Sequence, residues 1–114
     1  MSLSDTVKHQ VGTVLRAFCK RRVPREVRDK VRLTYGIRGN AVTLYEDRPR
    51  GKDPGQWGHM AIAQFRFDQA NEEWTLYCAD RNSKWHEYLE VDSTSRFESL
   101  LVEVDKDPTG IFFG

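Results

Sequence analysis

The sequence predicts an α+β fold: a five-stranded antiparallel meander sheet with an N-terminal and a C-terminal helix packed on one face. Helical spacing of apolar residues is found near the two ends of the 114-residue chain. Between them lie five short segments that alternate in polarity or are rich in aromatic residues, as half-buried strands are. The connections are short and hold no helical crossover, so neighbouring strands must be antiparallel. The length is that of a single domain, residues 1–114.

The first helix is expected to start after Ser4, whose hydroxyl can cap it, and to run to about Arg21. Its apolar residues fall on one helical stripe: Val7, Val11, Val14, Leu15 and Phe18. Pro24 interrupts the pattern, and residues 25–30 can form one more short turn.

The first two strands follow as a hairpin. Residues 31–38 alternate with a period of two, and Gly39-Asn40 is a tight-turn pair. The second strand runs from Ala41 to about Asp47 and must stop at Pro49, which cannot donate to a ladder. Residues 48–58 have no period and contain two prolines and three glycines. We therefore expect one long loop there, which is typical of a functional or disordered segment.

Three more strands are predicted at residues 60–67, 74–79 and 85–91, joined by polar hairpin connections. A second helix follows, with capping-box spacing at 95–98 and an end before Pro108. Its apolar face is Phe97, Leu100, Leu101 and Val104. The last segment, 110–114, is apolar enough that we expect it to dock onto the body.

Alternation along the strands assigns residues to two sheet faces. The helix-covered face is predicted to carry Val31, Leu33, Tyr35, Ile37, Val42, Leu44, Ala63, Phe65, Phe67, Trp74, Leu76 and Cys78, with Ala61 on the same side as Ala63. The uncovered face is predicted to carry Arg32, Thr34, Tyr45, Gln64, Arg66, Thr75, Tyr77, His86 and Tyr88. Arginines and amphipathic rings suit base stacking, a dimer interface or packing of the C-terminal tail, and the sequence leaves these open.

The net charge of +1 hides an asymmetry between the two halves of the chain. Residues 1–52 hold 13 Lys and Arg against 5 Asp and Glu, whereas residues 53–114 hold 5 against 12. A basic half can indicate a nucleic-acid or phosphate partner. Alternatively, the two halves face each other within the fold or in a dimer.

Cysteine usage and hydropathy predict a cytoplasmic protein without membrane association. Cys19 and Cys78 both lie in apolar patterns rather than in a paired spacing, which indicates reduced thiols, with Cys78 buried and inert. No apolar run approaches the length of a membrane span, and the N-terminal residues are too polar for a signal peptide. His9, His59 and His86 lack metal-ligand spacing, and no glycine-rich phosphate loop is present, so no metal or cofactor is predicted.

Several motifs resemble those of a family of small uncharacterised bacterial proteins that is classed as a domain of unknown function. They are Thr43-Leu44-Tyr45-Glu46 followed by Arg48-Pro49, then Trp74-Thr75-Leu76-Tyr77, then Asp80-Arg81-Asn82 with Lys84-Trp85-His86 and Tyr88, and finally residues 107–114, where similar proteins often have tryptophan in place of Phe113. The resemblance spans nearly the whole chain. It implies a bacterial source and carries no assigned activity.

Two functional hypotheses follow. The first is a non-enzymatic binding domain whose Arg/Tyr/His face engages nucleic acid, a protein partner or a second copy. The second is a small enzyme or ligand-binding protein with a polar site around Glu46, Asp80, Arg81 and His86, where His86 is the candidate acid or base. The sequence favours the first. The candidate binding residues are Arg32, Tyr45, Glu46, Arg48, Arg66, Tyr77, Asp80, Arg81, Asn82, His86 and Tyr88.

Overall fold

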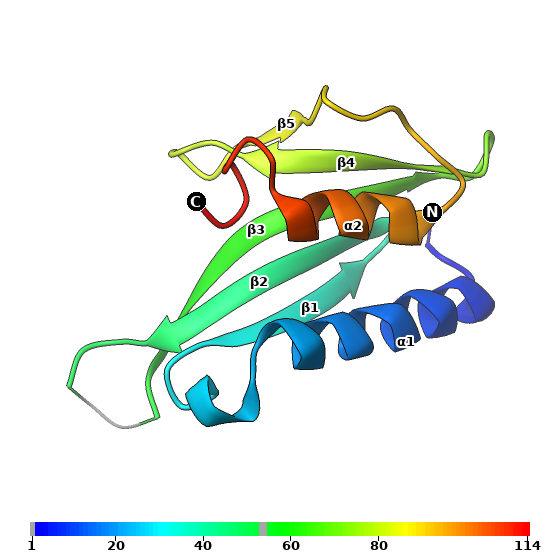
Figure 1. Cartoon of the computed structure of the whole chain (residues 1–114). Helices are drawn as coiled ribbons and strands as arrows, with labels where there is room; N and C mark the ends of the chain where they lie inside the picture. The colour runs from blue at the N-terminus through cyan, green and yellow to red at the C-terminus, as the bar shows by residue number, and fades with distance from the viewer. Residues whose placement is uncertain (1, 53–54) are drawn as a thin grey trace.

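A five-stranded sheet carries both helices on the same face (Figure 1). The computed structural model describes residues 2–52 and 55–114; of the predicted long loop, residues 53 and 54 therefore lie outside the described part. The elements are α1 (Asp5–Arg22), the 3₁₀ turn η1 (Arg25–Val27), β1 (Arg32–Arg38), β2 (Ala41–Pro49), β3 (Trp57–Asp68), β4 (Glu73–Ala79), β5 (Trp85–Glu87) and α2 (Phe97–Lys106). The predicted fold class is confirmed.

The sheet is a simple meander in which the strands lie side by side in chain order and all pairs are antiparallel. The hairpin between β1 and β2 closes at the pair Arg38 and Ala41. Gly39 has a φ of 61° in this two-residue turn, whereas Asn40 does not have a positive φ. Glycine in the first turn position is what a type II′ turn requires, and this explains why the Gly-Asn order forms a hairpin.

Of the two helix starts, the cap predicted for α1 is confirmed and the cap predicted for α2 is not. Ser4 caps α1 as predicted, because its hydroxyl accepts the backbone N–H of Val7 at 3.2 Å. The capping box predicted for α2 is wrong: Arg96 is the N-cap residue and makes no side-chain cap bond. The helix ends at Lys106, before Pro108, as predicted.

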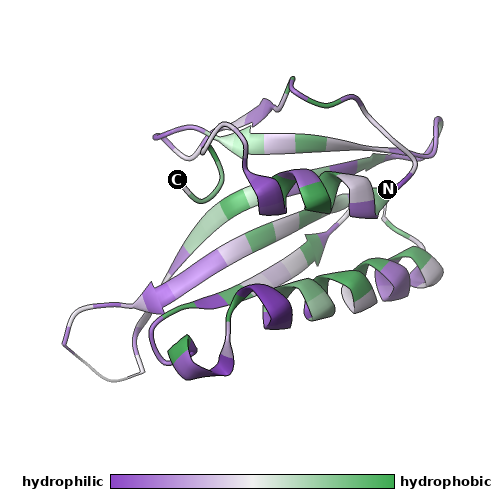
Figure 2. Ribbon diagram, viewed as in Figure 1, coloured by the Kyte–Doolittle hydropathy of each residue, from purple (hydrophilic) through white to green (hydrophobic). Residues whose placement is uncertain are grey.

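The core lies between the helix pair and the sheet. Green, apolar segments line α1 and the middle of the strands in Figure 2, whereas the projecting end of the β2–β3 hairpin is hydrophilic. Of the residues predicted for the covered face, Leu33, Val42, Leu44, Ala63, Phe65, Trp74, Leu76 and Cys78 are buried, and Val31, Tyr35, Ile37 and Phe67 are partly buried against them. Trp74 and Phe97 meet edge to face at 5.0 Å, which joins α2 to the sheet.

A bulge in β3 corrects one predicted side-chain direction. Leu44 pairs with Ala63, but the next residue, Tyr45, pairs with Ala61, so Ile62 is the extra residue of a β-bulge. Ile62 is only 4% exposed. The bulge places Ala61 on the same face as Tyr45, opposite to Ala63, and the prediction that Ala61 and Ala63 share a face is wrong.

The prediction that His86 and Tyr88 lie on the uncovered face is also wrong. Tyr77 pairs with Glu87 and Cys78 pairs with His86, so it is Glu87 that shares a face with Tyr77. Tyr88 lies on the helix side and is 4% exposed, and its hydroxyl donates to a Glu103 carboxylate oxygen of α2 at 2.9 Å. A shift of one residue in register reverses every side chain of a strand, and the short β5 has no periodicity that sets its register.

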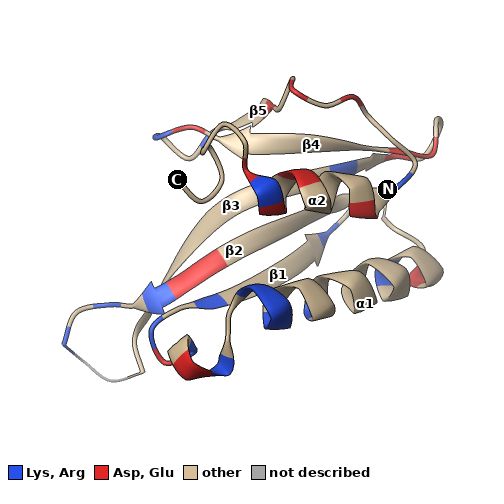
Figure 3. Cartoon of the chain, in the orientation of Figure 1, with Lys and Arg blue, Asp and Glu red and all other residues tan. Residues whose placement is uncertain are grey.

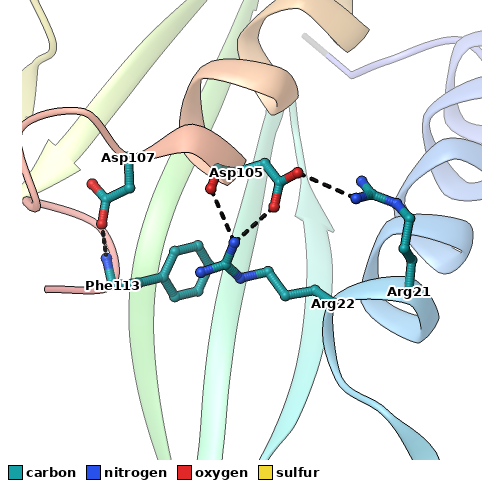
Figure 4. Close-up of polar contacts among 5 residues, drawn as sticks. All are labelled: Arg21, Arg22, Asp105, Asp107 and Phe113. Atoms are coloured by element: carbon teal, nitrogen blue, oxygen red, sulfur yellow. Dashed lines mark hydrogen bonds and ion pairs between the residues drawn. The ribbon is translucent and has the colours of Figure 1, made fainter.

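The C-terminal loop, residues 107–114, docks beside α2 on the helix side of the sheet, which confirms the prediction that the last segment packs on the body. Asp107, in the left-handed region with a φ of 44°, accepts the backbone N–H groups of Phe112 at 3.0 Å and Phe113 at 2.8 Å. Phe112 is buried against Tyr88, with ring centroids 5.0 Å apart. The guanidinium of Arg22 lies 3.8 Å from the Phe113 ring centroid, so the loop also contacts the end of α1 (Figure 4).

Arg22 also joins the two helices. Its Nη1 donates to the Asp105 carboxylate at 2.7 Å and to the Asp105 carbonyl at 3.0 Å, and Arg21 donates to the same carboxylate at 3.2 Å (Figure 4). The basic and acidic halves of the chain therefore do face each other at this point. Within the described parts of the chain, no helix is both long and apolar enough to cross a membrane.

Candidate functional site

The sheet face that points away from both helices is covered by neither helix nor by the C-terminal loop (Figure 1). Its residues follow from the strand register, and those at its centre are Arg32, Thr34, Thr43, Tyr45, Asp47, Trp57, His59, Gln64, Arg66, Thr75 and Tyr77. We call this set the stacking face. Of the candidate residues predicted from the sequence, Arg32, Tyr45, Arg66 and Tyr77 belong to it.

At one end of the stacking face, an arginine and a histidine side chain each lie against an aromatic ring. The guanidinium carbon of Arg32 is 3.7 Å from the centroid of the Trp57 ring. The rings of Tyr45 and His59 stack with centroids 3.8 Å apart and planes inclined by 26°. Arg32 and His59 are exposed, whereas their ring partners Trp57 and Tyr45 are partly buried.

Asp47 fixes the orientation of the His59 ring. Its Oδ1 lies 2.5 Å from His59 Nδ1, and its Oδ2 accepts the Thr34 hydroxyl at 3.1 Å. These contacts join β1, β2 and β3 across the sheet. The His59 ring is held by Asp47 at its edge and by Tyr45 on one face, so it loses little additional freedom when a flat ligand stacks on it.

At the other end of the face, a chain of hydrogen bonds holds a third stack. Gln64 Nε2 donates to the Thr43 hydroxyl at 2.9 Å, and Gln64 Oε1 accepts from Arg66 Nε at 2.7 Å. Arg66 is thereby held with its guanidinium carbon 3.9 Å from the centroid of the Tyr77 ring. The three stacks together span β1 to β4.

The prediction from sequence missed Asp47, Trp57 and His59 as members of this face. Trp57 falls within the predicted long loop, whereas β3 starts at Trp57 rather than at the predicted Met60. Trp57, His59 and Ala61 stand at every second position, a strand period that indicates the extension. The glycine and proline content of the preceding residues obscures it.

The turn between β4 and β5 holds the second group of predicted residues. Asp80 Oδ1 accepts the backbone N–H groups of Asn82 at 2.8 Å and Lys84 at 3.0 Å, and Asp80 Oδ2 lies 2.7 Å from His86 Nε2. The hydrogen bond to His86 and then that of Lys84 lower the pKa of the Asp80 carboxyl. These bonds use Asp80 to close the turn, while Arg81 and Asn82 are exposed at its tip.

Glu46 does not join this group. Its carboxylate binds Arg48 Nε at 2.7 Å on the helix side of β2, and β3 lies between β2 and β4, which Asp80 follows. A hollow of about 320 Å³ beside the turn is lined by Asp80, Arg81, Ser83 and the C-terminal loop. Within residues 2–52 and 55–114, Glu46 makes no hydrogen bond to the turn, and no cluster of three His, Cys, Asp or Glu residues is arranged to hold a metal ion.

The thiols are unsuited to nucleophilic chemistry. Burial raises the pKa of the Cys19 thiol from 9.0 to about 11. Burial is also the largest of the effects that raise the pKa of Cys78, which is 7% exposed and donates to the carbonyl of His86 at 3.6 Å. A reactive cysteine requires a lowered pKa, so both thiols are expected to react slowly.

Positive charge collects at one end of the molecule. Figure 3 shows Lys and Arg in blue at the end of α1, at the start of β1 and at the end of β2, where the β2–β3 hairpin projects; the red segments at this end, on β2 and on the turn after α1, are fewer. Acidic residues are more frequent on α2 and around β5. The positive end adjoins the Arg32–Trp57 stack, because Arg32 begins β1 and Trp57 begins β3.

Comparison with known proteins identifies a family but no function. The family model described as Domain of unknown function (DUF3024) matches residues 3–114. No curated protein and no solved structure matches the chain.

Proposed function

The chain belongs to the Domain of unknown function (DUF3024) family, and we propose that it is a non-enzymatic binding domain whose stacking face binds single-stranded nucleic acid. The observation that carries the proposal is the row of three stacks, each of which joins an aromatic ring to an arginine or a histidine. Proteins that bind single strands stack bases on aromatic rings and on guanidinium planes, and they track the backbone with cations.

The geometry of the face supports a flat, extended ligand. The stacks come from four adjacent strands, which lie about 4.8 Å apart, so they form a platform rather than a pocket. Arg32 and His59 are exposed, and each is oriented by a neighbouring side chain. Two of the three stacks contain an arginine, Arg32 or Arg66, and the guanidinium charge favours a phosphate-bearing partner.

A second copy of the chain is the less favoured partner for this face. The centre of a stable protein interface is usually apolar and depleted in charge. The large hydrophobic side chains that are exposed among the described residues are Val27, Met60, Leu89, Val102 and Ile111, and none of them belongs to the stacking face. The neighbouring positive end further favours an anionic partner.

The polar site around the β4–β5 turn supports enzyme activity less well. Asp80 and His86 form one pair, Glu46 and Arg48 form another, and a strand lies between them. General acid–base chemistry requires the acid and the base to reach one substrate atom. The contacts of Asp80 are accounted for by closure of the turn.

The proposal is tested by fluorescence anisotropy with labelled single-stranded DNA and RNA oligonucleotides, and with the corresponding duplexes. Trp57→Ala and Arg66→Ala should each weaken single-strand binding about 5- to 100-fold, because stacking contributes about 1–3 kcal/mol per base. Lys8→Ala, on the exposed side of α1, is the matched control and should bind like the wild type. Neutralisation of about three phosphates predicts a roughly 10- to 20-fold loss of affinity between about 50 and 200 mM salt.

Two outcomes would overturn the proposal. One is the absence of binding to any oligonucleotide at low salt. The other is binding that Trp57→Ala and Arg66→Ala leave unchanged while both variants remain folded by circular dichroism. Light scattering tests whether a second copy of the chain is the partner instead. If the protein is a dimer and either variant dissociates it, the stacking face is the dimer interface.

A further inference from the structure

A groove runs between α1 and β1 at the edge of the sheet. Two hollows of about 240 and 360 Å³ share four lining residues, Cys19, Lys20, Leu33 and Thr34, and therefore adjoin along this edge. The sides come from α1 and from β1, which is the edge strand of the meander. Leu33 and Cys19 make the floor apolar.

Four cations line this groove: Arg16, Lys20, Arg28 and Arg32. Among the described residues no Asp or Glu lines either hollow. The carboxylate that touches a lining side chain is Asp47, which accepts from Thr34 and is already paired with His59. The groove is therefore strongly positive.

Neutral groups hold the arginines in place. Arg16 donates to the Tyr35 hydroxyl at 3.2 Å, Arg28 to the Val23 carbonyl at 3.2 Å, and Arg32 to the Arg28 carbonyl at 3.2 Å. The arginines outside the groove that form ion pairs are Arg21, Arg22 and Arg48. The groove cations are thus oriented without being neutralised, which is the state that favours an anionic partner.

The backbone of β1 provides the second half of the site. A two-residue turn closes the β1–β2 hairpin at Arg38 and Ala41, so the hydrogen-bonded pairs occur at every second residue from that point. The N–H and C=O groups of Leu33, Tyr35 and Ile37 consequently point away from β2, toward the open edge. An edge strand with free backbone groups is a template for another strand.

We propose that this groove binds an extended acidic peptide segment, which adds to β1 as a sixth strand. Backbone hydrogen bonds to β1 supply sequence-independent affinity, and the cations select acidic side chains. α1 forms the opposite side of the groove, so the peptide lies between a helix and an edge strand. The site shares Arg32 and Thr34 with the edge of the stacking face but otherwise consists of different residues, and the inference does not depend on nucleic-acid binding.

The probe is a labelled ten-residue peptide that alternates valine and glutamate, compared with the same peptide N-methylated at every second amide. The unmodified peptide should bind, and N-methylation should abolish binding because the added strand can no longer donate to β1. Lys20→Glu should weaken binding about tenfold, since an attraction is replaced by a repulsion. Lys8→Glu makes the same charge change on the same helix outside the groove and should have no effect.

Nuclear magnetic resonance locates the contact, because the amides of Leu33, Tyr35 and Ile37 should become protected from exchange when the peptide is bound. Equal affinity for the N-methylated peptide, or no binding of either peptide at millimolar concentration, overturns the inference. So does a Lys20→Glu variant that loses affinity for single-stranded DNA but not for the peptide, which would assign the groove to nucleic acid. Arg66→Ala, which weakens single-strand binding and lies outside the groove, should leave peptide binding unchanged, so failure of the two proposals can be told apart.

Discussion

The contact between the two helices permits a quantitative prediction about Asp105→Asn. The substitution keeps the size of the side chain and removes its charge. Asp105 accepts from Arg22 at 2.7 Å and from Arg21 at 3.2 Å, and the side chains of Asp105 and Arg22 are 29% and 30% exposed (Figure 4). Hydrogen bonds to charged groups contribute about 1.5–3 kcal/mol, and exposed ion pairs contribute less than about 1 kcal/mol.

The partly exposed geometry places Asp105 between these limits. We expect the free energy of unfolding to fall by about 1–2 kcal/mol at about pH 7. Arg21 is 65% exposed, so most of the loss should come from the contact with Arg22. In a separate variant, Arg22→Lys should retain part of the ion pair with Asp105 but lose the stacking on Phe113, whose ring centroid lies 3.8 Å from the guanidinium carbon.

The loss should depend on pH. Desolvation opposes ionisation of Asp105, but the hydrogen bonds and charges of Arg22 and Arg21 outweigh it, so the pKa is lowered from 3.8. A carboxyl whose pKa is lowered by folding contributes stability above its unfolded pKa, and the contribution is lost as pH falls through the folded value. The difference between the wild type and Asp105→Asn should therefore be complete at neutral pH and shrink toward zero below the unfolded pKa.

Urea denaturation followed by tryptophan fluorescence, repeated across this pH range, measures the effect. Asp92→Asn is the matched control, because Asp92 is exposed and forms no ion pair within the described residues. A loss that is equal at all pH values would show that the charge of Asp105 is not responsible. A loss no larger than that of Asp92→Asn at neutral pH would refute the reasoning altogether.

Two further predictions concern the C-terminal loop and the thiols. Phe112→Ala should lower the free energy of unfolding by about 2–4 kcal/mol, because Phe112 is 5% exposed and packs on Tyr88; thermal denaturation measures it, and a change in melting temperature below about 2 °C would contradict the packing role. Alkylation of Cys19 by iodoacetamide at about pH 8 should be roughly a hundredfold slower in the folded protein than in urea, because burial raises its pKa to about 11 from 9.0; rates that agree within a factor of three would contradict it.

Much of the fold could be predicted because the local patterns and the short connections agree. Ser4, the stripe on α1 and the alternation in β1 each indicate their element without reference to distant residues. The order of the strands follows from the short links, which leave antiparallel neighbours as the simplest solution. Alternation also assigned Arg32, Tyr45, Arg66 and Tyr77 to the uncovered face, as the register shows.

The errors arose where a pattern is short or interrupted. The extra residue Ile62 reverses the faces of β3 beyond it, and no local signal distinguishes a bulge from continued alternation. The register of β5 depends on its pairing with β4 across a five-residue turn, so its three residues alone could not place His86. Both errors changed the composition of the candidate site.

The sequence by itself determined which residues are apolar, where the helices and most strands lie, and that one sheet face would carry arginines and rings. The period at which apolar residues recur is visible within each segment, so it predicts that segment's helix or strand without reference to the rest of the chain. Only the tertiary structure decided that Trp57 and His59 lie beside Arg32 and Tyr45, and that the C-terminal loop packs on the helix side rather than on the stacking face. Those contacts join segments whose relative register and packing depend on the whole chain, because a single added residue or a shifted pairing redirects every side chain that follows.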